Sequence, residues 1–440
     1  MSEEKKKKIS SSLIAAVIVI IILLVVLVYY ATLPPVAVEK TVTIEKTVTI
    51  EKTVTTALTT PIKGKVIVWY DVLPEMEKLF KEIVETDFKK LYPDIEVELL
   101  DTPDLWTKIT AAIPVGEGPD LFMWAHDWTG RLVESGFIVP IDEFITPDLK
   151  EKFVESAWKA CIYEGKVWAL PDAAETVCLI YNKKMIEEAG VSLPKNTDEL
   201  EAIMKKFVEK GYYGISYPWD PYHVSAYVHA FGGYYFDDVT KKVGVNDPKT
   251  IQGLRFTFEK FKPYMPPEPT WEVQKGAFLE GKAPFMVTGP WLVGDIKAAG
   301  IEPGFLLLPE VPGVGTPKPY TGVKLTWMSS NVRNKEAAFV FMKWWATSVK
   351  LAVERAKKFS WIPVLKEALE HEDVKKDPIV SLFAKQVALG IPMPSSPEMM
   401  HVWGPVSDVQ QAVWVGAKTL EDALNEAQAK IEEEIAKMKG

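Results

Sequence analysis

The hydrophobic positions near the start of the chain form one uninterrupted run from Leu13 to Tyr30, without any charged side chain. At ~1.5 Å of helical rise per residue, a run of this length spans about 27 Å, which matches the hydrocarbon core of a bilayer. Lys5–Lys8 precede the run and are expected to stay cytoplasmic. We therefore predict that residues 1–33 form a cytoplasmic lysine cluster and an uncleaved signal anchor. A cleaved signal peptide is the alternative, although the small-residue site near Ala31 is poor.

Residues 34–62 carry a different pattern, a threonine-rich repeat of six residues. Thr41–Lys46 reads TVTIEK, returns as Thr47–Lys52 and begins again at Thr53. Such a repeat has few large apolar groups and cannot build a core alone. Because alternating Thr and Val favour an extended backbone, we predict a stalk that holds the rest of the chain away from the membrane. A coiled coil fits less well, since its repeat is seven residues.

From Lys63 the pattern alternates between the period of a buried strand and that of an amphipathic helix. The apolar residues from Met76 to Leu91 recur at spacings of three and four, and Pro93 ends that helix. Strands are expected at residues 65–70, 95–99 and 120–124, with a short helix running toward Val115. Strand–helix–strand units of this size predict a parallel sheet, whose ligands collect at the carboxyl ends of the strands.

A second region of the same kind is expected after Pro171. Its strands are predicted at residues 176–181, 212–217 and 284–288, and its helices at residues 198–210, 249–261 and 272–279. The last segment, residues 419–439, has one apolar face and is predicted to be a helix. Thr419 is its expected N-cap, with Asp422 three residues further on.

Composition excludes some classes of partner. Lys+Arg 51 against Asp+Glu 60 gives a net charge of −9, and no basic stripe follows the first ten residues, so we expect no nucleic-acid partner. The two cysteines, Cys161 and Cys178, are both expected in strands. A disulfide between neighbouring strands and two buried free thiols remain equally open. The chain has no CxxC motif and only 5 scattered histidines, so we expect no metal and no cofactor.

The segment Phe122–Trp128 carries the most specific chemistry. It places Trp124 and Asp127 at the end of a predicted strand. A pyranose ring offers an apolar face to an indole and hydroxyls to a carboxylate, so this pair suits a sugar. The alternative is that these aromatics, like many of the 15 tryptophans, only pack in the core.

The sequence does not match most of the motifs that are typical of enzymes. Gly276–Lys282 fits a phosphate-binding loop until Ala283, where a Ser or Thr would hold magnesium. The segment also looks helical, so Gly281 is better explained as a C-terminal cap. A glycosidase remains the enzymatic alternative, because hydrolysis needs two carboxyls in one cleft. Three acids are candidates for that cleft, and we prefer to interpret them as acceptors of sugar hydroxyls: Asp127, Glu175 and Asp220.

Several short motifs, none of them specific alone, follow one another in a particular order. They are Trp124–Asp127, Leu179–Lys183, Ala230–Tyr234, Phe278–Gly281, Gly289–Trp291, Gly322–Val323 and Met393–Pro394 followed by Trp403. In this order they resemble maltose/maltodextrin-binding proteins, the extracytoplasmic receptors of ABC importers. Trp128 and residues 173–177, 235–238 and 362–365 are most similar to the archaeal branch. The resemblance extends from residue 63 to residue 440.

The resemblance implies an α/β, two-lobed, type II periplasmic-binding-protein-like fold that closes over sugar at a hinge. One lobe would comprise residues 63–172 with about 323–372, and the other residues 173–322 with about 373–440. The implied sugar-binding residues are Trp124, Trp291 and Trp403 as stacking platforms, Asp127 and Glu175 as hydroxyl acceptors, Tyr222 as a mixed contact, and Asp220 and Asp71. Some positions depart from the bacterial pattern. Trp128 replaces an Arg, Asp220 a Glu and Gly404 a Tyr, and Asp71 is the acid nearest to a missing Gly-Asp-Lys run.

We therefore predict a non-enzymatic, monomeric receptor on the cell surface, tethered by its N-terminal helix. It would deliver maltose/maltodextrin-like α-glucosides to the permease subunits of an ABC transporter. A receptor for another sugar, such as trehalose, and a cell-surface glycosidase are the alternatives.

Overall fold

The structure, a computed structural model, describes residues 62–72 and 74–439. The predicted anchor at residues 1–33 and all but the last residue of the predicted stalk lie outside these ranges. No helix among the described residues combines the length and the apolar character needed to cross a bilayer.

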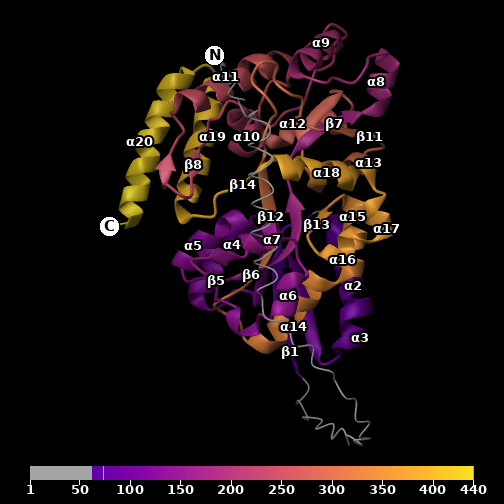
Figure 1. The fold of residues 1–440 in the computed structure, drawn as a ribbon, viewed down its shortest axis with the longest axis vertical. Helices are drawn as coiled ribbons and strands as arrows, with labels where there is room; N and C mark the ends of the chain where they lie inside the picture. The colour runs from indigo at the N-terminus through magenta and orange to yellow at the C-terminus, as the bar shows by residue number, and fades with distance from the viewer. Residues whose placement is uncertain (1–61, 73, 440) are drawn as a thin grey trace, which may run out of the picture. The chain divides into compact units, whose positions relative to one another are not determined.

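Seven strands form the larger of two main sheets (Figure 1). β1 (Gly64–Tyr70) lies between β2 (Ile95–Asp101) and β3 (Leu121–Ala125), and both neighbours run parallel to it. This confirms the predicted parallel unit. β12 (Tyr320–Met328) joins β3 antiparallel, and β6 (Ala169–Glu175) joins β12 antiparallel, so the complete sheet is mixed. The short strands are β13 (Ile362–Pro363) beside β6 and β14 (Ile391–Pro392) beside β12.

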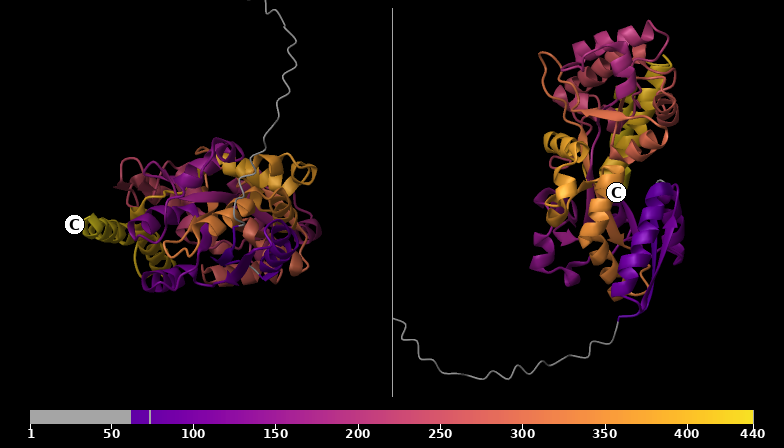
Figure 2. Two further views of the ribbon diagram at one scale, coloured as in Figure 1. Left: turned by 90° about the horizontal axis from the view of Figure 1, so that it is seen from below. Right: turned by 90° about the vertical axis from the view of Figure 1, so that its right-hand side faces the viewer.

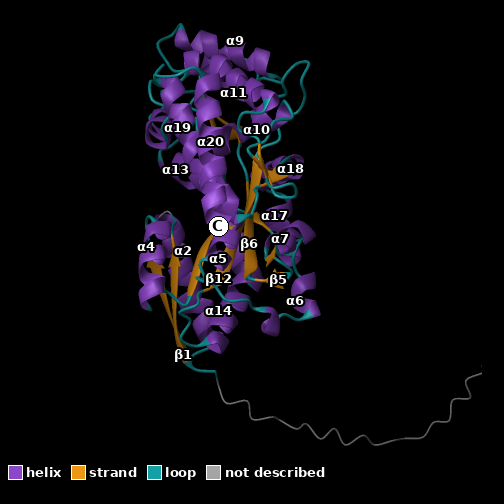
Figure 3. Cartoon of the chain, turned by 90° about the vertical axis from the view of Figure 1, so that its left-hand side faces the viewer, coloured by secondary structure: helices purple, strands orange, loops and turns teal. Residues whose placement is uncertain are grey.

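Successive side chains of β3 point to opposite faces of this sheet and enter different cores. Leu121 and Met123 pack in the core that contains α2 (Pro74–Ile83) and α14 (Lys335–Thr347). Phe122 packs on the opposite face, in the core that contains α4 (Leu105–Ala112) and α5 (Thr129–Glu134). Helices therefore cover both faces of the sheet (Figure 3). The same part of the chain includes α6 (Pro147–Glu151), α7 (Glu155–Ala160), the hairpin β4–β5 (Ile162–Tyr163 and Lys166–Val167), α15 (Val349–Phe359), α16 (Lys366–Leu369) and α17 (Glu372–Lys375).

The helix predicted from Met76 to Leu91 is continuous but not uniform. After α2 it loosens into a π-helical turn at Val84–Phe88 and ends in α3 (Lys89–Leu91). The apolar side chains of the turn, Val84 and Phe88, remain buried in the core, so the predicted face is kept.

The second sheet corrects the expectation of another parallel unit. β7 (Cys178–Asn182) lies between β10 (Phe285–Thr288) and β11 (Pro303–Leu306), and both neighbours run antiparallel to it. The strand predicted at residues 212–217 is also wrong, because this segment makes only one bridge, from Ser216 to β10. Pairing does not continue, because the next residue that would face β10 is Pro218, which has no N–H to donate, and the Tyr217 N–H donates to the side chain of Gln274.

Helices gather around this second sheet and form a separate core. They are α9 (Thr197–Val208), α10 (Pro221–Ala230), α11 (Pro248–Phe261), α19 (Met400–Trp414) and α20 (Leu420–Lys439). These helices lie together at one end of the folded part of the molecule that the structure describes. The first strands, drawn in indigo, lie at the other end (Figure 2). The remaining elements here are α8 (Lys183–Ala189), α12 (Trp271–Leu279), α13 (Val293–Ala298), α18 (Pro378–Leu389) and the hairpin β8–β9 (Phe236–Asp237 and Lys242–Val243).

The start of α20 confirms the predicted N-cap. The Thr419 hydroxyl accepts the Asp422 N–H at 3.2 Å and donates to the Asp422 carboxylate at 2.8 Å. Leu424 and Ile431 are fully buried on the predicted apolar face of the helix.

The two cysteines are free thiols. Cys178 begins β7 as expected, but Cys161 follows α7 rather than lying in a strand, so that expectation is wrong. The two side chains are buried in different cores, which is why they do not meet. Burial raises the pKa of both thiols well above the ordinary value.

Candidate functional site

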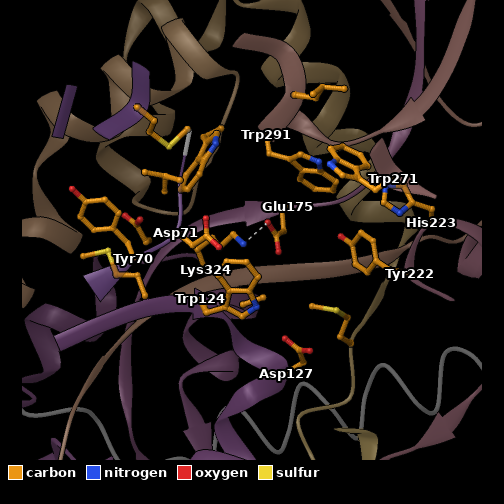
Figure 4. Close-up of a pocket in the computed structure, with 18 of the residues that line it drawn as sticks. Tyr70, Asp71, Trp124, Asp127, Glu175, Tyr222, His223, Trp271, Trp291 and Lys324 are labelled. Atoms are coloured by element: carbon orange, nitrogen blue, oxygen red, sulfur yellow. Dashed lines mark ion pairs between the residues drawn. The ribbon is translucent and has the colours of Figure 1, made fainter. Parts of the chain in front are cut away.

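A cavity of about 670 Å³ opens where the strands of the first sheet end, beside the start of α10 and the 3₁₀ turn Pro290–Leu292. All eight residues predicted from the sequence line it: Asp71, Trp124, Asp127, Glu175, Asp220, Tyr222, Trp291 and Trp403. In Figure 4 the side chains of Trp124, Glu175 and Trp291 approach the same space from different elements. The structure thus brings the predicted set together, and their role in binding remains a prediction.

Trp124 has two close neighbours. Its indole stacks on Trp128, with ring centroids 5.1 Å apart and planes 29° apart, and Trp106 packs edge-on against Trp128. The Lys324 ammonium lies 4.4 Å from the centroid of the Trp124 ring. Trp124, which lines the cavity, therefore has both an aromatic and a cationic neighbour.

Lys324 also compensates the charge of Glu175. Its Nζ lies 3.1 Å from the Glu175 carboxylate, and both side chains are mostly buried. The two residues stand on neighbouring strands, β12 and β6. Gly322 provides the space for this pair, because a Cβ there would lie 2.8 Å from Cγ and Oε1 of Glu175.

Asp127 differs from Glu175 in its surroundings. It follows β3 in a 3₁₀ turn, His126–Trp128, and is buried. Burial and then the nearby Glu175 charge raise the pKa of Asp127 from 3.8 to about 7, while Lys324 and Trp403 partly oppose the shift. Near neutral pH this carboxyl therefore exists in both protonation states, so it can donate or accept a hydrogen bond.

Asp71 also lines the cavity and comes directly after β1. Burial and then the Asp101 charge raise the pKa of Asp71 above its ordinary value, and the backbone of Asp104 opposes the shift.

The start of α10 presents three cavity residues in sequence. Asp220 is the N-cap, and its Oδ1 accepts the N–H groups of Tyr222 and His223, both at 3.0 Å. Its Oδ2 lies 2.7 Å from Nδ1 of His223. The Asp220 carboxylate is therefore already occupied by three contacts within the protein. Burial raises the pKa of the Tyr222 phenol well above its ordinary value, so this hydroxyl stays protonated.

Trp291 and Trp403 reach the cavity from separate elements. Trp291 lies in the Pro290–Leu292 turn, and its ring covers Gly289, where any side chain would collide with it. Trp403 lies on α19 and packs edge-on against Tyr320, with centroids 5.7 Å apart. Both rings are only partly buried, as expected for side chains that form the wall of a cavity.

Several cavity residues escaped the sequence analysis. They are Tyr70, Asp172, His223, Trp271, Lys275, Asp295, Lys324 and Trp361. Tyr70 ends a predicted strand, and His223 follows the predicted site residue Tyr222. Their positions in the sequence could therefore have identified both as cavity residues. For Trp271 and Trp361 the sequence alone does not distinguish a cavity wall from a core.

Five buried polar atoms of residues that line the cavity have no hydrogen-bond partner within residues 62–72 and 74–439. They are the hydroxyls of Tyr70 and Tyr222, one carboxylate oxygen each of Asp127 and Asp172, and Nε2 of His223. Buried polar groups without partners are costly and uncommon in folded proteins. Their position among aromatic rings fits a ligand that has both apolar faces and many hydroxyls.

The fold and the cavity together are typical of a protein that binds a small solute. The chain belongs to the family of bacterial extracellular solute-binding proteins, whose sequence model matches residues 71–349. Its relatives include the maltotriose-binding protein of Pyrococcus abyssi, which is 43% identical over 78% of this chain and 76% of the relative. A galactooligosaccharide-binding protein of Bacillus subtilis is 25% identical over 83% of this chain and 88% of the relative.

Solved structures agree with this assignment. The Thermus thermophilus maltotriose-binding protein, bound with maltotriose, superposes with a TM-score of 0.75 at 27% identity. The match covers 84% of this chain and 100% of that one. These similar proteins are solute-binding receptors and not enzymes, which supports the same class for this chain.

Proposed function

We propose that this protein is the extracytoplasmic receptor of an ABC importer and binds maltotriose and related maltodextrins. The observation that carries the proposal is the lining of the cavity, which combines aromatic rings with residues whose buried polar atoms have no partner among the described residues. The 43% identity to a maltotriose-binding protein supports an α-glucoside as the ligand. In this proposal Trp291 and Trp403 stack on sugar rings, and Asp127, Glu175 and Tyr222 bind hydroxyls.

A titration of the purified protein with maltose, maltotriose and longer maltodextrins tests the ligand. Galactooligosaccharides, trehalose and cellobiose serve as competitors, because the B. subtilis relative is named for a galactooligosaccharide. We expect maltotriose or a longer maltodextrin to bind most tightly by calorimetry. A clear preference for galactooligosaccharides or trehalose would replace the α-glucoside in the proposal and keep the receptor class.

Binding is expected to occur without turnover. Asp127 and Glu175 share one cavity, but Lys324 already pairs with Glu175, and the residues described as lining the cavity include no Ser, Thr or Cys that could serve as a nucleophile. We expect maltotriose incubated with the protein to be recovered intact by chromatography. Release of glucose or maltose in proportion to the amount of protein would instead establish a glycosidase.

We propose that the two lobes close over the sugar about a hinge in β6 and β12. The lobe boundaries predicted near residues 172/173 and 322/323 fall inside these strands. The β6–β12 ladder also shifts register between Lys324 and Leu325, and such irregularities bend strands. Closure would bring the side chains of Trp124 and Trp291 into contact with the same bound sugar.

We also propose that residues 13–30 anchor the receptor in the cell membrane and that the threonine-rich repeats act as a spacer. A tether raises the local concentration of the binding domain near a membrane-embedded permease. N-terminal sequencing and fractionation of the native protein test this proposal. A soluble mature chain that starts near Thr32 would overturn the anchor.

A further inference from the structure

His223 lines the cavity, and its imidazole has one nitrogen that is firmly held and one buried nitrogen without a partner among the described residues. Its side chain is only 9% exposed and lines the cavity. Its Nε2 has no hydrogen-bond partner in the part of the chain that the structure describes. Neither the resemblance in the sequence nor the predicted site included this residue.

Asp220 fixes the orientation of the His223 ring. Its Oδ2 lies 2.7 Å from Nδ1, and its Oδ1 accepts the His223 N–H at 3.0 Å. The Tyr217 hydroxyl donates to the His223 carbonyl at 3.0 Å, so the backbone is held as well. A carboxylate only accepts hydrogen bonds, so Nδ1 must carry the proton and donate it to Asp220. In the neutral ring, Nε2 is then a hydrogen-bond acceptor.

Three aromatic rings pack near the imidazole. The ring of Trp271 lies 5.8 Å from it at 35°, and the ring of Trp291 lies 6.1 Å from it at 86°. Tyr222 contacts it edge-on at 5.8 Å, and all three aromatic residues line the same cavity. In Figure 4 these rings cluster at one side of the cavity, away from Tyr70 and Asp71.

We propose that His223 is a further sugar-binding residue and that it accepts a hydrogen bond from a hydroxyl of the bound oligosaccharide at Nε2. Trp271 and Trp291 flank this hydroxyl and provide the apolar walls for its pyranose ring. Asp220 is a positioning residue, which acts by fixing the His223 ring rather than by contacting the sugar. This inference rests on the proposed function and adds a subsite to it.

The alternative is that His223 only packs between the two tryptophans. His223→Phe distinguishes a sugar-binding role from a packing role, because it keeps an aromatic ring and removes Nε2. His229→Phe is the matched control. His229 is also buried on α10, and its Nδ1 contacts the Lys318 carbonyl at 2.7 Å, but it does not line the cavity.

Calorimetric titration of the full chain with maltotriose and maltotetraose gives the first readout. We expect His223→Phe to weaken the binding of at least one of these sugars by on the order of tenfold, which corresponds to ~1.4 kcal/mol. His229→Phe should change affinity by less than about twofold while lowering the melting temperature at least as much. Equal affinities of wild type and His223→Phe for both sugars would overturn the inference.

A spectroscopic readout covers the case in which His223→Phe does not fold. In wild-type protein with ¹⁵N-labelled histidine, saturating maltotriose should shift the Nε2 resonance of His223 and leave that of His229 in place. A His223 resonance that does not move when sugar binds would also overturn the inference. Asp220→Asn tests the positioning role, because Asn still caps α10 but donates to Nδ1 and forces the proton onto Nε2.

With Asp220→Asn we expect the Nε2 resonance to change to that of a protonated nitrogen while the melting temperature changes little. An unchanged Nε2 resonance would exclude the positioning role. Failure of the proposed function gives a different result, because wild-type protein would then bind neither maltotriose nor maltotetraose. If it binds galactooligosaccharides instead, the comparison of His223→Phe with His229→Phe is made with that sugar. If it binds no sugar, both proposals fail.

Discussion

At the scale of single residues, neighbouring carboxyls in one cavity acquire different properties. Glu175 has Lys324 at 3.1 Å, whereas Asp127 is buried with one oxygen unpartnered among the described residues. Burial then raises the pKa of Asp127 to about 7. The unfolded chain, in contrast, ionises this group near its ordinary pKa of 3.8. The unfolded state therefore loses the proton first, and the Asp127 contribution to stability declines as pH rises from about 4 to about 7.

We expect Asp127→Asn to remove this decline. Relative to wild type, its melting temperature without sugar should be similar at pH 4 and higher at pH 8. Burial also lowers the pKa of His126 and of His229 to about 4. The wild type and Asp127→Asn therefore both lose stability as pH falls below the ordinary histidine pKa of 6.5. This loss is common to wild type and variant and cancels in the comparison. A difference in melting temperature that is independent of pH between 4 and 8 would contradict the raised pKa of Asp127.

The partly buried tryptophans of the cavity should affect binding more than folding. We expect Trp291→Ala and Trp403→Ala each to weaken sugar binding by ~1–3 kcal/mol, as for aromatic anchors in desolvated sites. Trp327 is the control, since it is fully buried in a core outside the cavity. Its replacement by Ala should cost ~3–5 kcal/mol of folding stability. Calorimetric affinity and melting temperature, measured on the same preparations, distinguish the two classes; the reverse pattern would make Trp291 and Trp403 core residues.

At the scale of elements, the ends of strands bring the site together. β1 ends at Tyr70, β3 ends beside Trp124 and β6 ends at Glu175, and all three residues line the cavity. β12 contributes both Lys324 and Gly322, which places a cation and an open space opposite Glu175. The geometry of the ion pair therefore depends on the register of β12 against β6.

Gly322→Ala tests this dependence on strand packing. The added Cβ would lie 2.8 Å from the Glu175 side chain, which must move away and leave Lys324. We expect sugar affinity to fall by about tenfold, or ~1.4 kcal/mol, because Glu175 leaves its position.

Gly276→Ala is the control for that variant. It lies inside α12, and a Cβ there meets nothing within 4 Å, so it should stabilise the fold by ~0.5–1 kcal/mol. Sugar affinity should not change in this variant. Unchanged affinity in Gly322→Ala as well would show that the position of Glu175 does not matter for binding.

At the scale of the whole described chain, the two sheets are joined by the segments that line the cavity. β6 of the first sheet leads almost directly into β7 of the second, and Glu175 lies at the end of β6. Under the proposed closure, a ligand that contacts residues on both sides of this connection would stabilise the closed arrangement and the folded state together.

We expect maltotriose at about 100 times its dissociation constant to stabilise the fold by ~2.7 kcal/mol. The melting temperature should rise, and the radius of gyration measured by small-angle X-ray scattering should fall. The double variant Trp291→Ala, Trp403→Ala should show a smaller rise in melting temperature and less compaction at the same sugar concentration. A rise in melting temperature without compaction would retain binding but exclude closure about the hinge.

Much of this protein follows from the sequence itself. The spacing of apolar residues determined β1, α2 and β3, because helical and strand periods are properties of neighbouring residues. It also placed Trp124 and Asp127 at the carboxyl end of a parallel strand, where the cavity lies. The N-cap of α20 could also be predicted, because Thr419 and Asp422 are only three residues apart in the sequence.

The tertiary structure decided what depends on residues far apart in the chain. The direction of β10 and β11 beside β7 is set by segments that return after long intervals, so the local pattern did not reveal the antiparallel sheet. Lys324 reaches the Trp124 ring and Glu175 only through the pairing of β12 with β3 and β6. The raised pKa of Asp127 arises from burial, and burial depends on the whole surrounding structure. The sequence supplied the chemical groups, and their electrostatic states were determined by which groups the fold placed beside them.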